Sequence, residues 1–495
     1  MVTSIRALTL ISVGMLVLGC ADSQTNRATP ERLNGLLTQG PDAERLALAN
    51  ERLAAALGRE NATGQLADSF ESDPADGGDA QPLNALFALA LERNADIGQA
   101  AQAINRADVA RMNAIYGYLP QVSASATYAE LQQEVIQSDN EVFAQGTANY
   151  PVTTFGVELT QPIFNLSRIF NIQLQNTART VAEVEYIAAV QRVTFETFDT
   201  YVTAAQSEAR IQRLRERMRL IGQQITSEAT LTDIGLGTDT LRNSYAAERA
   251  ALASEEAIEA TRLASALADL SFLTGTTVTD VASISVPSAI LRSERRSSVA
   301  NGISAAEAQN PALLATAIGV VEADLSRKQA IAADFAPVLD AFARYEDETR
   351  EGSRFGGGSQ TADTTVGVRL TIPIFNANGQ GYQSALESVD LRSAALEYFA
   401  IRRQLRSQIS STYQRMTQLS TAIAQSSTSV SRAATNVRIE RERVESGESV
   451  ELAVISRRLT ESSARETLEF QRLEYLKAWG RFQYLTGASL GETGL

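Results

Sequence analysis

The feature that most limits how this chain can fold is a short stretch that occurs twice, each time between an alternating run and a long helical pattern. Gln161-Pro162-Ile163-Phe164-Asn165 ends one Thr/Val-rich run, and Ile372-Pro373-Ile374-Phe375-Asn376 ends another. Each copy is followed by roughly 65 to 70 residues without a proline, which predicts helices about 100 Å long. We therefore interpret Pro162 and Pro373 as strand-to-helix junctions in a duplicated unit.

Other markers repeat in the same order and at nearly the same spacing. Gly275 and Gly487 are 212 residues apart, and Asn94 and Asn310 are 216 apart. This spacing predicts a first repeat at 82–275, a link at 276–300, a second repeat at 301–487 and a C-terminal tail at 488–495.

Residues 1–20 have the pattern of an export signal that ends in a lipidation motif. Arg6 supplies the positive charge, and the apolar stretch after it is too short to span a bilayer as a helix. Val17-Leu18-Gly19-Cys20 resembles a lipobox, so we predict that Cys20, the only cysteine, carries lipid. The alternative is an ordinary signal peptide that ends near a cysteine. Residues 21–81 are expected to be an N-terminal extension and polar linker.

Alternating apolar and polar residues predict two strands in each repeat. The clearest runs are Val122 to Tyr128, Phe155 to Leu159 and Val366 to Ile372. Leu83 to Tyr118 has the pattern of a single helix. The long helix of the first repeat shows a coiled-coil seam of 4-3-4 spacing at Leu214, Met218, Ile221 and Ile225.

Four strands in one chain constrain how such a protein can enter a membrane. Four strands cannot close a membrane-spanning barrel, and an open sheet edge is not stable in lipid. Several copies must therefore share one barrel, and three copies would supply twelve strands. The predicted fold is mainly α with a transmembrane β part: a β-barrel shared between copies, twelve-stranded if there are three, continued by an α-helical barrel.

Composition excludes several classes of function. The net charge of −14 argues against a nucleic-acid partner, because neutralising phosphates requires a basic face. The chain contains no histidine, which removes imidazole bases, Ser-His-Asp systems and histidine-ligated metals, and one cysteine cannot form a cysteine metal cluster. We therefore expect no enzyme activity, no cofactor and no metal; a carboxylate-only hydrolase survives in principle, without paired acids to support it.

Several of these features together resemble the TolC-like outer-membrane efflux channels. They are the duplicated unit of strand, Pro-Ile-Phe and long helix, its glycine turns, the Leu-Thr-Gly ends at 273–275 and 485–487, and the lipobox. The resemblance covers about residues 82–490. It implies a trimer in the outer membrane, anchored by lipid, with a helical tunnel in the periplasm and a belt around it that includes the link. It also implies a passive exit duct for drugs or other small molecules, docked to a periplasmic adaptor (a membrane fusion protein) and an inner-membrane pump.

The resemblance also suggests where such partners would bind. Ile234-Gly235-Leu236 is similar to the family's Val-Gly-Leu tip, and Gly447 with Glu448 is a weaker second copy. The simpler interpretation is a glycine cap that reverses a helix. Acidic residues beside the turns are candidates for the periplasmic entrance: Asp233, Asp239, Glu448 and Glu451. Repetition around a threefold axis would favour cations there, whereas the alternative is a set of ordinary solvated acids.

Two other functions stay open from the sequence. The same architecture would serve the outer-membrane component of a type I protein secretion system. A periplasmic coiled-coil adaptor or scaffold would keep the helical hairpins but would not need duplicated alternating strands. The exported substrate, the cognate pump and the role of residues 21–81 are not predicted.

Overall fold

The computed structural model describes residues 80–135, 146–234, 237–292, 298–352, 357–375, 379–488 and 490. The chain divides into two compact units, Met1–Ala75 and Asp76–Leu495, and every described residue belongs to the second. Cys20 and the rest of the predicted signal and extension lie outside the described residues.

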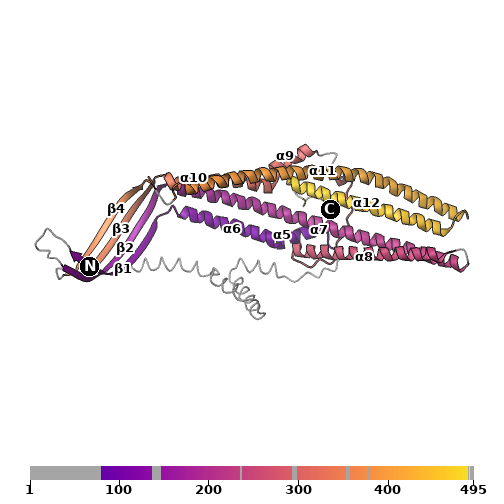
Figure 1. Cartoon of the computed structure of the whole chain (residues 1–495), viewed down its shortest axis with the longest axis horizontal. Helices are drawn as coiled ribbons and strands as arrows, with labels where there is room; N and C mark the ends of the chain where they lie inside the picture. Colours follow the sequence, from indigo (N-terminus) through magenta and orange to yellow (C-terminus); the bar gives the residue numbers. More distant parts are fainter. Residues whose placement is uncertain are drawn as a thin grey trace, which may run out of the picture. The chain divides into compact units, whose positions relative to one another are not determined.

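The described residues contain the same order of elements twice: two helices, then two strands, then two helices (Figure 1). The first set is α5 (Leu83–Arg93), α6 (Ala95–Tyr116), β1 (Gln121–Val135), β2 (Gly146–Asn165), α7 (Leu166–Asp233) and α8 (Asp239–Thr274). The second is α9 (Val299–Gln309), α10 (Pro311–Phe335), β3 (Val338–Arg350), β4 (Ser359–Thr371), α11 (Tyr382–Glu445) and α12 (Glu451–Thr486). The prediction of a mainly helical chain with antiparallel strand pairs is confirmed.

The single helix predicted over 83–118 is wrong, because Asn94 divides it. The backbone of Asn94 is extended, and its side-chain oxygen accepts hydrogen bonds from the amides of Asp96 and Ile97 at 3.0 and 3.4 Å. Its amide nitrogen donates to the carbonyl of Leu273 at 3.0 Å. Asn310 does the same in the second set, where it caps α10 and donates to the carbonyl of Leu485 at 3.1 Å. A buried side chain that bonds three backbone groups at Asn94 and two at Asn310 explains why asparagine ends a helix at both places.

The four strands form one antiparallel sheet in the order β1-β2-β3-β4, which leaves β1 and β4 at its edges. One row of neighbours across the sheet is Val122, Leu159, Ala343 and Val366, and the next is Ser123, Glu158, Arg344 and Thr365. Because side chains alternate along a strand, these rows lie on opposite faces. In these rows one face is apolar and the other polar across all four strands; elsewhere Gln161 lies on the apolar face and Phe342 on the polar face. On the polar face, Arg344 and Glu158 form an ion pair at 2.9 Å.

Pro162 and Pro373 lie close to where strand gives way to helix, but the strand at Pro162 continues farther than the sequence indicated. Pro162 lies inside β2, opposite Asp340, at a register shift, and α7 begins at Leu166, capped by the side chain of Asn165. The pairing with β1 ends at Thr160, so beyond that point β2 pairs only with β3, and a residue without an amide hydrogen is tolerated there. Pro373 follows the end of β4, well before α11 begins at Tyr382.

The helices pack as two layers that share α7 and α11. Beside the sheet the packing order is α6-α7-α10-α11, and farther from it the order is α8-α7-α12-α11 (Figure 1). The 68 residues of α7 give a helix about 100 Å long. No helix among the described residues has both the length and the apolar character that crossing a membrane would require.

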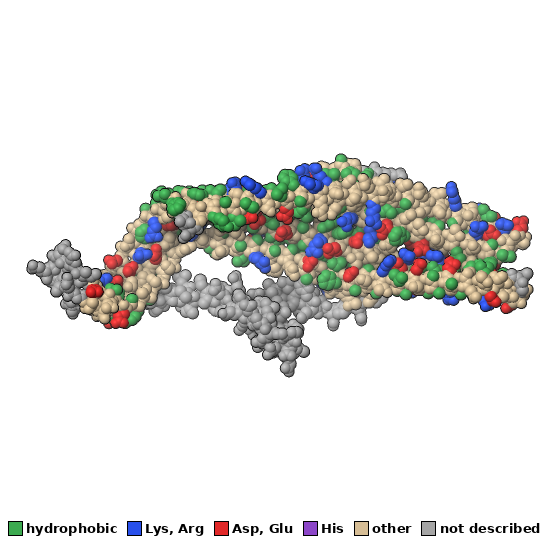
Figure 2. Space-filling view, in the orientation of Figure 1, with side chains coloured by type: hydrophobic (Ala, Val, Ile, Leu, Met, Phe, Trp, Pro, Cys, Tyr) green, Lys and Arg blue, Asp and Glu red, His purple; other side chains and the backbone are tan. Residues whose placement is uncertain are grey.

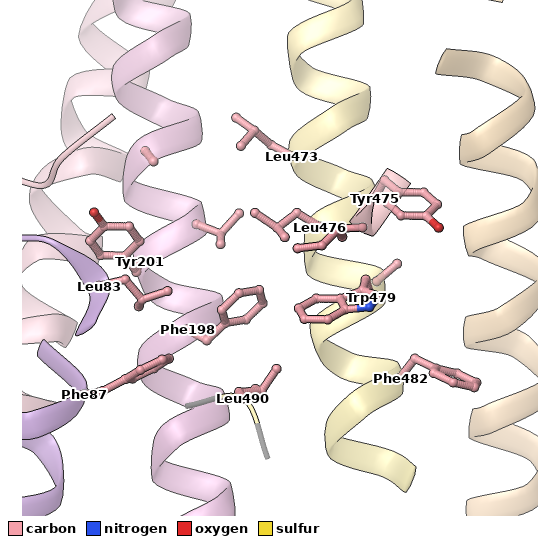
Figure 3. Packing of buried hydrophobic residues seen from close by; sticks show 14 of the residues in the cluster. Leu83, Phe87, Phe198, Tyr201, Leu473, Tyr475, Leu476, Trp479, Phe482 and Leu490 are labelled. Carbon is pink, nitrogen blue, oxygen red and sulfur yellow. The ribbon is translucent and has the colours of Figure 1, made fainter. Parts of the chain in front are cut away.

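The main hydrophobic core lies where the two layers meet (Figure 3). Phe198 of α7 and Trp479 of α12 pack edge to face with ring centroids 6.4 Å apart, and Phe195 stacks on Tyr484 at 4.7 Å. The part of the link that is described also contributes, since Val278 is buried in this cluster. This core holds the two halves of the duplicated chain together.

Candidate functional site

The two turns at the far ends of the helical hairpins are the candidate site. Ile234, at the end of α7, is 65% exposed, whereas Gly235 and Leu236 lie outside the described residues. In the second turn, Gly447 has a φ of 78°, in the left-handed region, and Glu448 is exposed. The second turn therefore has the glycine cap that the sequence indicated.

The four acidic candidates are exposed and sit at helix ends. Asp233 is the last residue of α7, Asp239 the first of α8 and Glu451 the first of α12. A carboxylate in a first helical turn interacts favourably with the helix dipole. Asp239 also pairs with Arg242 at 2.8 Å. These local roles account for Asp239 and Glu451 without an external ligand, and two of the four candidates belong to each turn.

Two buried carboxylates at the same turns were missed by the sequence analysis. Glu228, only 3% exposed, accepts a hydrogen bond from the amide of Thr238, the residue that caps α8, at 2.8 Å. Glu440, 6% exposed, accepts one from the hydroxyl of Ser449, and Arg443 and Arg457 lie 3.7 and 3.8 Å away. The two residues are 212 apart, the spacing of Gly275 and Gly487. This repeat spacing is the sequence signal by which they could have been paired.

We predict that Glu228 and Glu440 fix the shape of the turns. Replacing Glu440 by alanine leaves the Ser449 hydroxyl and two guanidinium groups without their buried acceptor, and we expect local opening to become easier by about 1–3 kcal/mol. Hydrogen exchange of the amides at 446–450 measures this. Glu445→Ala, at the exposed end of the same helix, is the control. Equal exchange in the two variants would contradict the assignment.

The contact between α7 and α12 changes from aromatic to ionic toward the turns. Arg213 pairs with Glu469 at 3.1 Å and Arg217 with Glu466 at 3.4 Å, beside a cavity of about 300 Å³. Lys, Arg, Asp and Glu side chains are interspersed over this part of the visible surface (Figure 2). Partly exposed pairs of this kind contribute little stability, so the aromatic core is the firmer link between the hairpins. Among the described residues, no group of three or more acidic or cysteine side chains is placed to hold a metal.

Glu322, a carboxyl group on α10 that senses the charge of Glu185 on α7, should make the stability of the helical part depend on pH. Burial, and then the charge of Glu185, raises the pKa of Glu322. The folded state therefore holds this proton more tightly than the unfolded chain, so stability falls as pH rises from the ordinary pKa of glutamate through the raised value. We expect Glu322→Gln to raise the melting temperature at neutral pH and to flatten its pH dependence above about pH 5.

Glu307 is the control, because its pKa is shifted in the opposite direction. Its hydrogen bonds from Arg402 and Arg406 lower the pKa of its carboxyl, so its contribution is present above the ordinary pKa and is lost as pH falls through the lowered one. Glu307→Gln should therefore lower the melting temperature at neutral pH. Shifts of the same sign in both variants would contradict this account.

Comparison with known proteins identifies the class of this fold. The structure matches an outer-membrane channel of Campylobacter jejuni, CmeC, with a TM-score of 0.64 and 16% identity, covering 82% of this chain and 85% of CmeC. It matches VceC, an outer membrane protein of Vibrio cholerae, with a TM-score of 0.66, 14% identity and coverages of 82% and 96%. For the outer-membrane channel MtrE of Neisseria gonorrhoeae the values are 0.63, 14%, 82% and 89%. At these identities the likeness establishes the fold, which is that of outer-membrane channels.

A family model places the sequence more closely. Residues 302–488 match the family described as outer membrane efflux protein, and sequence comparison with curated proteins gives no significant match. The match covers the second of the two repeated sets of elements. The predicted resemblance is confirmed: the chain carries an outer membrane efflux protein domain and has the fold of the TolC-like outer-membrane channels. This is a family of channel proteins and not of enzymes.

Proposed function

We propose that three copies of this chain form a passive exit duct through the outer membrane and the periplasm, which exports drugs or other small molecules. The observation that carries the proposal is that the sheet and both helix layers stay open at matching edges. β1, α6 and α8 lie at one edge, and β4 and α11 lie at the other. A contact between one edge of a copy and the opposite edge of the next generates a closed ring when the rotation between copies closes.

The two faces of the sheet support a position in the outer membrane. One face of β2 is apolar from Phe155 to Leu159 and again at Phe164, with Gln161 between them; this span is about 30 Å along the strand and about 23 Å in height at a tilt of about 40°. That height is close to the apolar band of outer-membrane barrels. Tyr128 is 74% exposed on one side of the band and Phe375 is 83% exposed on the other, as expected for aromatic residues at membrane interfaces. Twelve strands would close the barrel, with the polar face lining the duct.

The helices would continue the duct into the periplasm. The helix layers end in the turns at Ile234 and Gly447, which we assign as the docking tips for a periplasmic adaptor. The adaptor would join the duct to an inner-membrane pump, and the exposed acids Asp233, Asp239, Glu448 and Glu451 would surround the entrance. Pro162 and Pro373 would lie at the inner end of the barrel, close to where the strands give way to helices.

We also propose a lipid anchor at Cys20 and the predicted division of the chain into signal peptide, extension, two repeats, link and tail. The 59 residues between Cys20 and Ala80 would reach about 200 Å when extended, whereas α5 and α6 together cover about 50 Å of the path from the core to the sheet. The extension is therefore long enough for the lipid to reach the inner leaflet of the outer membrane.

Fractionation of the host membranes tests this function. We expect a heat-modifiable trimer in detergent extracts of outer membrane, the co-purification of an adaptor and an inner-membrane pump, and drug sensitivity after deletion that the intact gene reverses. Export of a protein instead of small molecules would assign the duct to a type I secretion system. A monomer recovered only from the soluble periplasm would contradict the proposal and favour a scaffold.

A further inference from the structure

The polar face of the sheet carries a large aromatic side chain at Phe342 of β3. Its neighbours across the sheet are Thr160 on β2 and Gly367 on β4. A Cβ atom at Gly367 would lie 3.0 and 3.1 Å from Cζ and Cε1 of the Phe342 ring. The ring therefore lies over β4, in the space that a side chain at Gly367 would fill, and it is partly exposed.

The guanidinium group of Arg369 lies over this ring. Its Cζ atom is 4.9 Å from the ring centroid, which is the geometry of a cation–π contact. The residue directly opposite Arg369 is Asp340, but the structure, which describes both residues, places no ion pair between them. Arg369 instead reaches Phe342, its diagonal neighbour, as long side chains can across antiparallel strands. This contact holds the guanidinium group against the face of the sheet.

A second arginine on the same face shows what distinguishes Arg369. Arg344 donates to the carboxylate of Glu158 at 2.9 Å, so its charge is already matched. Arg369 is exposed, and among the described residues no carboxylate accepts a hydrogen bond from it. A guanidinium group has five N–H donors in a planar fork that fits a carboxylate or a sulfonate. Arg369 therefore presents an oriented cation whose N–H donors can bind an anion.

We propose that Arg369 and Phe342 form a binding site for planar aromatic anions on the wall of the duct. The N–H groups of Arg369 bind the acid group, and the exposed part of the Phe342 ring packs against the ring of the same molecule. The inference rests on the proposed function, because it requires the polar face of the sheet to line the duct. It adds a chemical class of compound that the duct holds during passage.

The other charges on this face argue against a small inorganic anion as the ligand. Toward the end of the strands away from the helices, Glu346 lies opposite Asp363, and Glu348 follows two residues later. Asp340 lies beside Arg369 itself. These acids weaken the attraction of any anion that contacts only the guanidinium group. A ligand must therefore gain from contact with the ring as well, and this requirement selects aromatic compounds.

Equilibrium dialysis of the purified trimer against 2-naphthoate tests the site. The fully hydrogenated analogue of 2-naphthoate has the same charge and nearly the same size but no aromatic ring. In nonionic detergent, with empty micelles as the blank, we expect the wild-type trimer to bind 2-naphthoate about fivefold more tightly than the analogue. Arg369→Gln should weaken the binding of both compounds about tenfold, because hydrogen bonds between charged groups are lost.

Two further variants, each recovered as a heat-modifiable trimer, separate the ring from the charge. Phe342→Leu should lower the affinity for 2-naphthoate to that of the analogue and change the affinity for the analogue less than about twofold. Arg344→Gln is the matched control, because Arg344 lies two rows from Arg369, about 13 Å along the strands. That separation exceeds the screening length of about 8 Å at physiological salt, so the binding of 2-naphthoate should change less than about twofold.

The outcomes separate this site from the proposed function. Wild-type trimers that bind 2-naphthoate no better than its analogue, or that bind it equally well with Arg369→Gln, would overturn the site and leave the duct in place. Equal losses in Arg344→Gln and Arg369→Gln would also overturn the site, since any positive charge on this face would then serve. A wild-type chain that is monomeric in outer-membrane extracts would overturn both the site and the duct.

Discussion

Gly480→Val is expected to prevent the central core of the helical part from packing. A Cβ atom at Gly480 would lie 2.1 Å from Cε1 and 2.7 Å from Cδ1 of the Phe198 ring. Phe198 is fully buried and packs edge to face on Trp479, so the ring cannot move aside without disturbing the contact between α7 and α12 (Figure 3). We expect a loss of roughly 3 kcal/mol of folding free energy, at the upper end of the cost of overpacking a core. Chemical unfolding of the purified protein measures it.

Gly222→Ala is the matched control for this substitution. Gly222 also lies in a long helix, α7, but a Cβ atom there would meet no atom within 4 Å. Alanine has the higher helix propensity, so we expect a gain of about 0.5–1 kcal/mol. Similar stabilities for the two variants would show that the close approach of α12 to α7 at Gly480 is wrong.

Val366→Arg is expected to stop insertion into the outer membrane. Val366 lies on the apolar face of β4, in the row of Val122, Leu159 and Ala343, and is 76% exposed in the single chain. An arginine facing lipid near the middle of an outer-membrane barrel costs about 2–4 kcal/mol, and a trimer would carry three of them. We expect the heat-modifiable trimer to disappear from the outer-membrane fraction.

The neighbouring residue tests whether the effect belongs to one face of the sheet. Thr365 precedes Val366 on the same strand but lies in the polar row of Arg344 and Glu158. Thr365→Arg should therefore insert normally, with only a changed charge on the face proposed to line the duct. If Thr365→Arg blocks insertion and Val366→Arg does not, the assignment of the two faces must be reversed.

Features that depend on local pattern were predictable from the sequence. The long helices begin and end close to where the absence of proline and the glycine turns placed them. The four residues of the predicted seam lie in one cluster, since Leu214 and Ile221 are buried together with Leu252, and Met218 and Ile225 pack against them. The alternation of apolar and polar residues was sufficient to predict the strands, because the sheet has one mainly apolar and one mainly polar face.

Features that depend on a partner distant in sequence were not predictable in the same way. Asn94 ends a helix because the carbonyl of Leu273, 179 positions away, accepts its side chain. Pro162 was expected to follow the end of its strand, but pairing with β3 continues β2 past it to Asn165. The acidic residues beside the turn glycines were selected from the sequence. Glu228 and Glu440 were not, because only the packing of the helices shows that these two helical glutamates are buried.

The sequence by itself determined the duplication, the helix and strand types and the alternation of the sheet, because periodicity and proline placement act through neighbours along the chain. Only the tertiary structure decided which residues are buried at the turns, how far β2 continues before its helix, and that the sheet and the helix layers are open at matching edges. Those features depend on contacts between elements far apart in sequence, and such contacts exist only after the chain has folded.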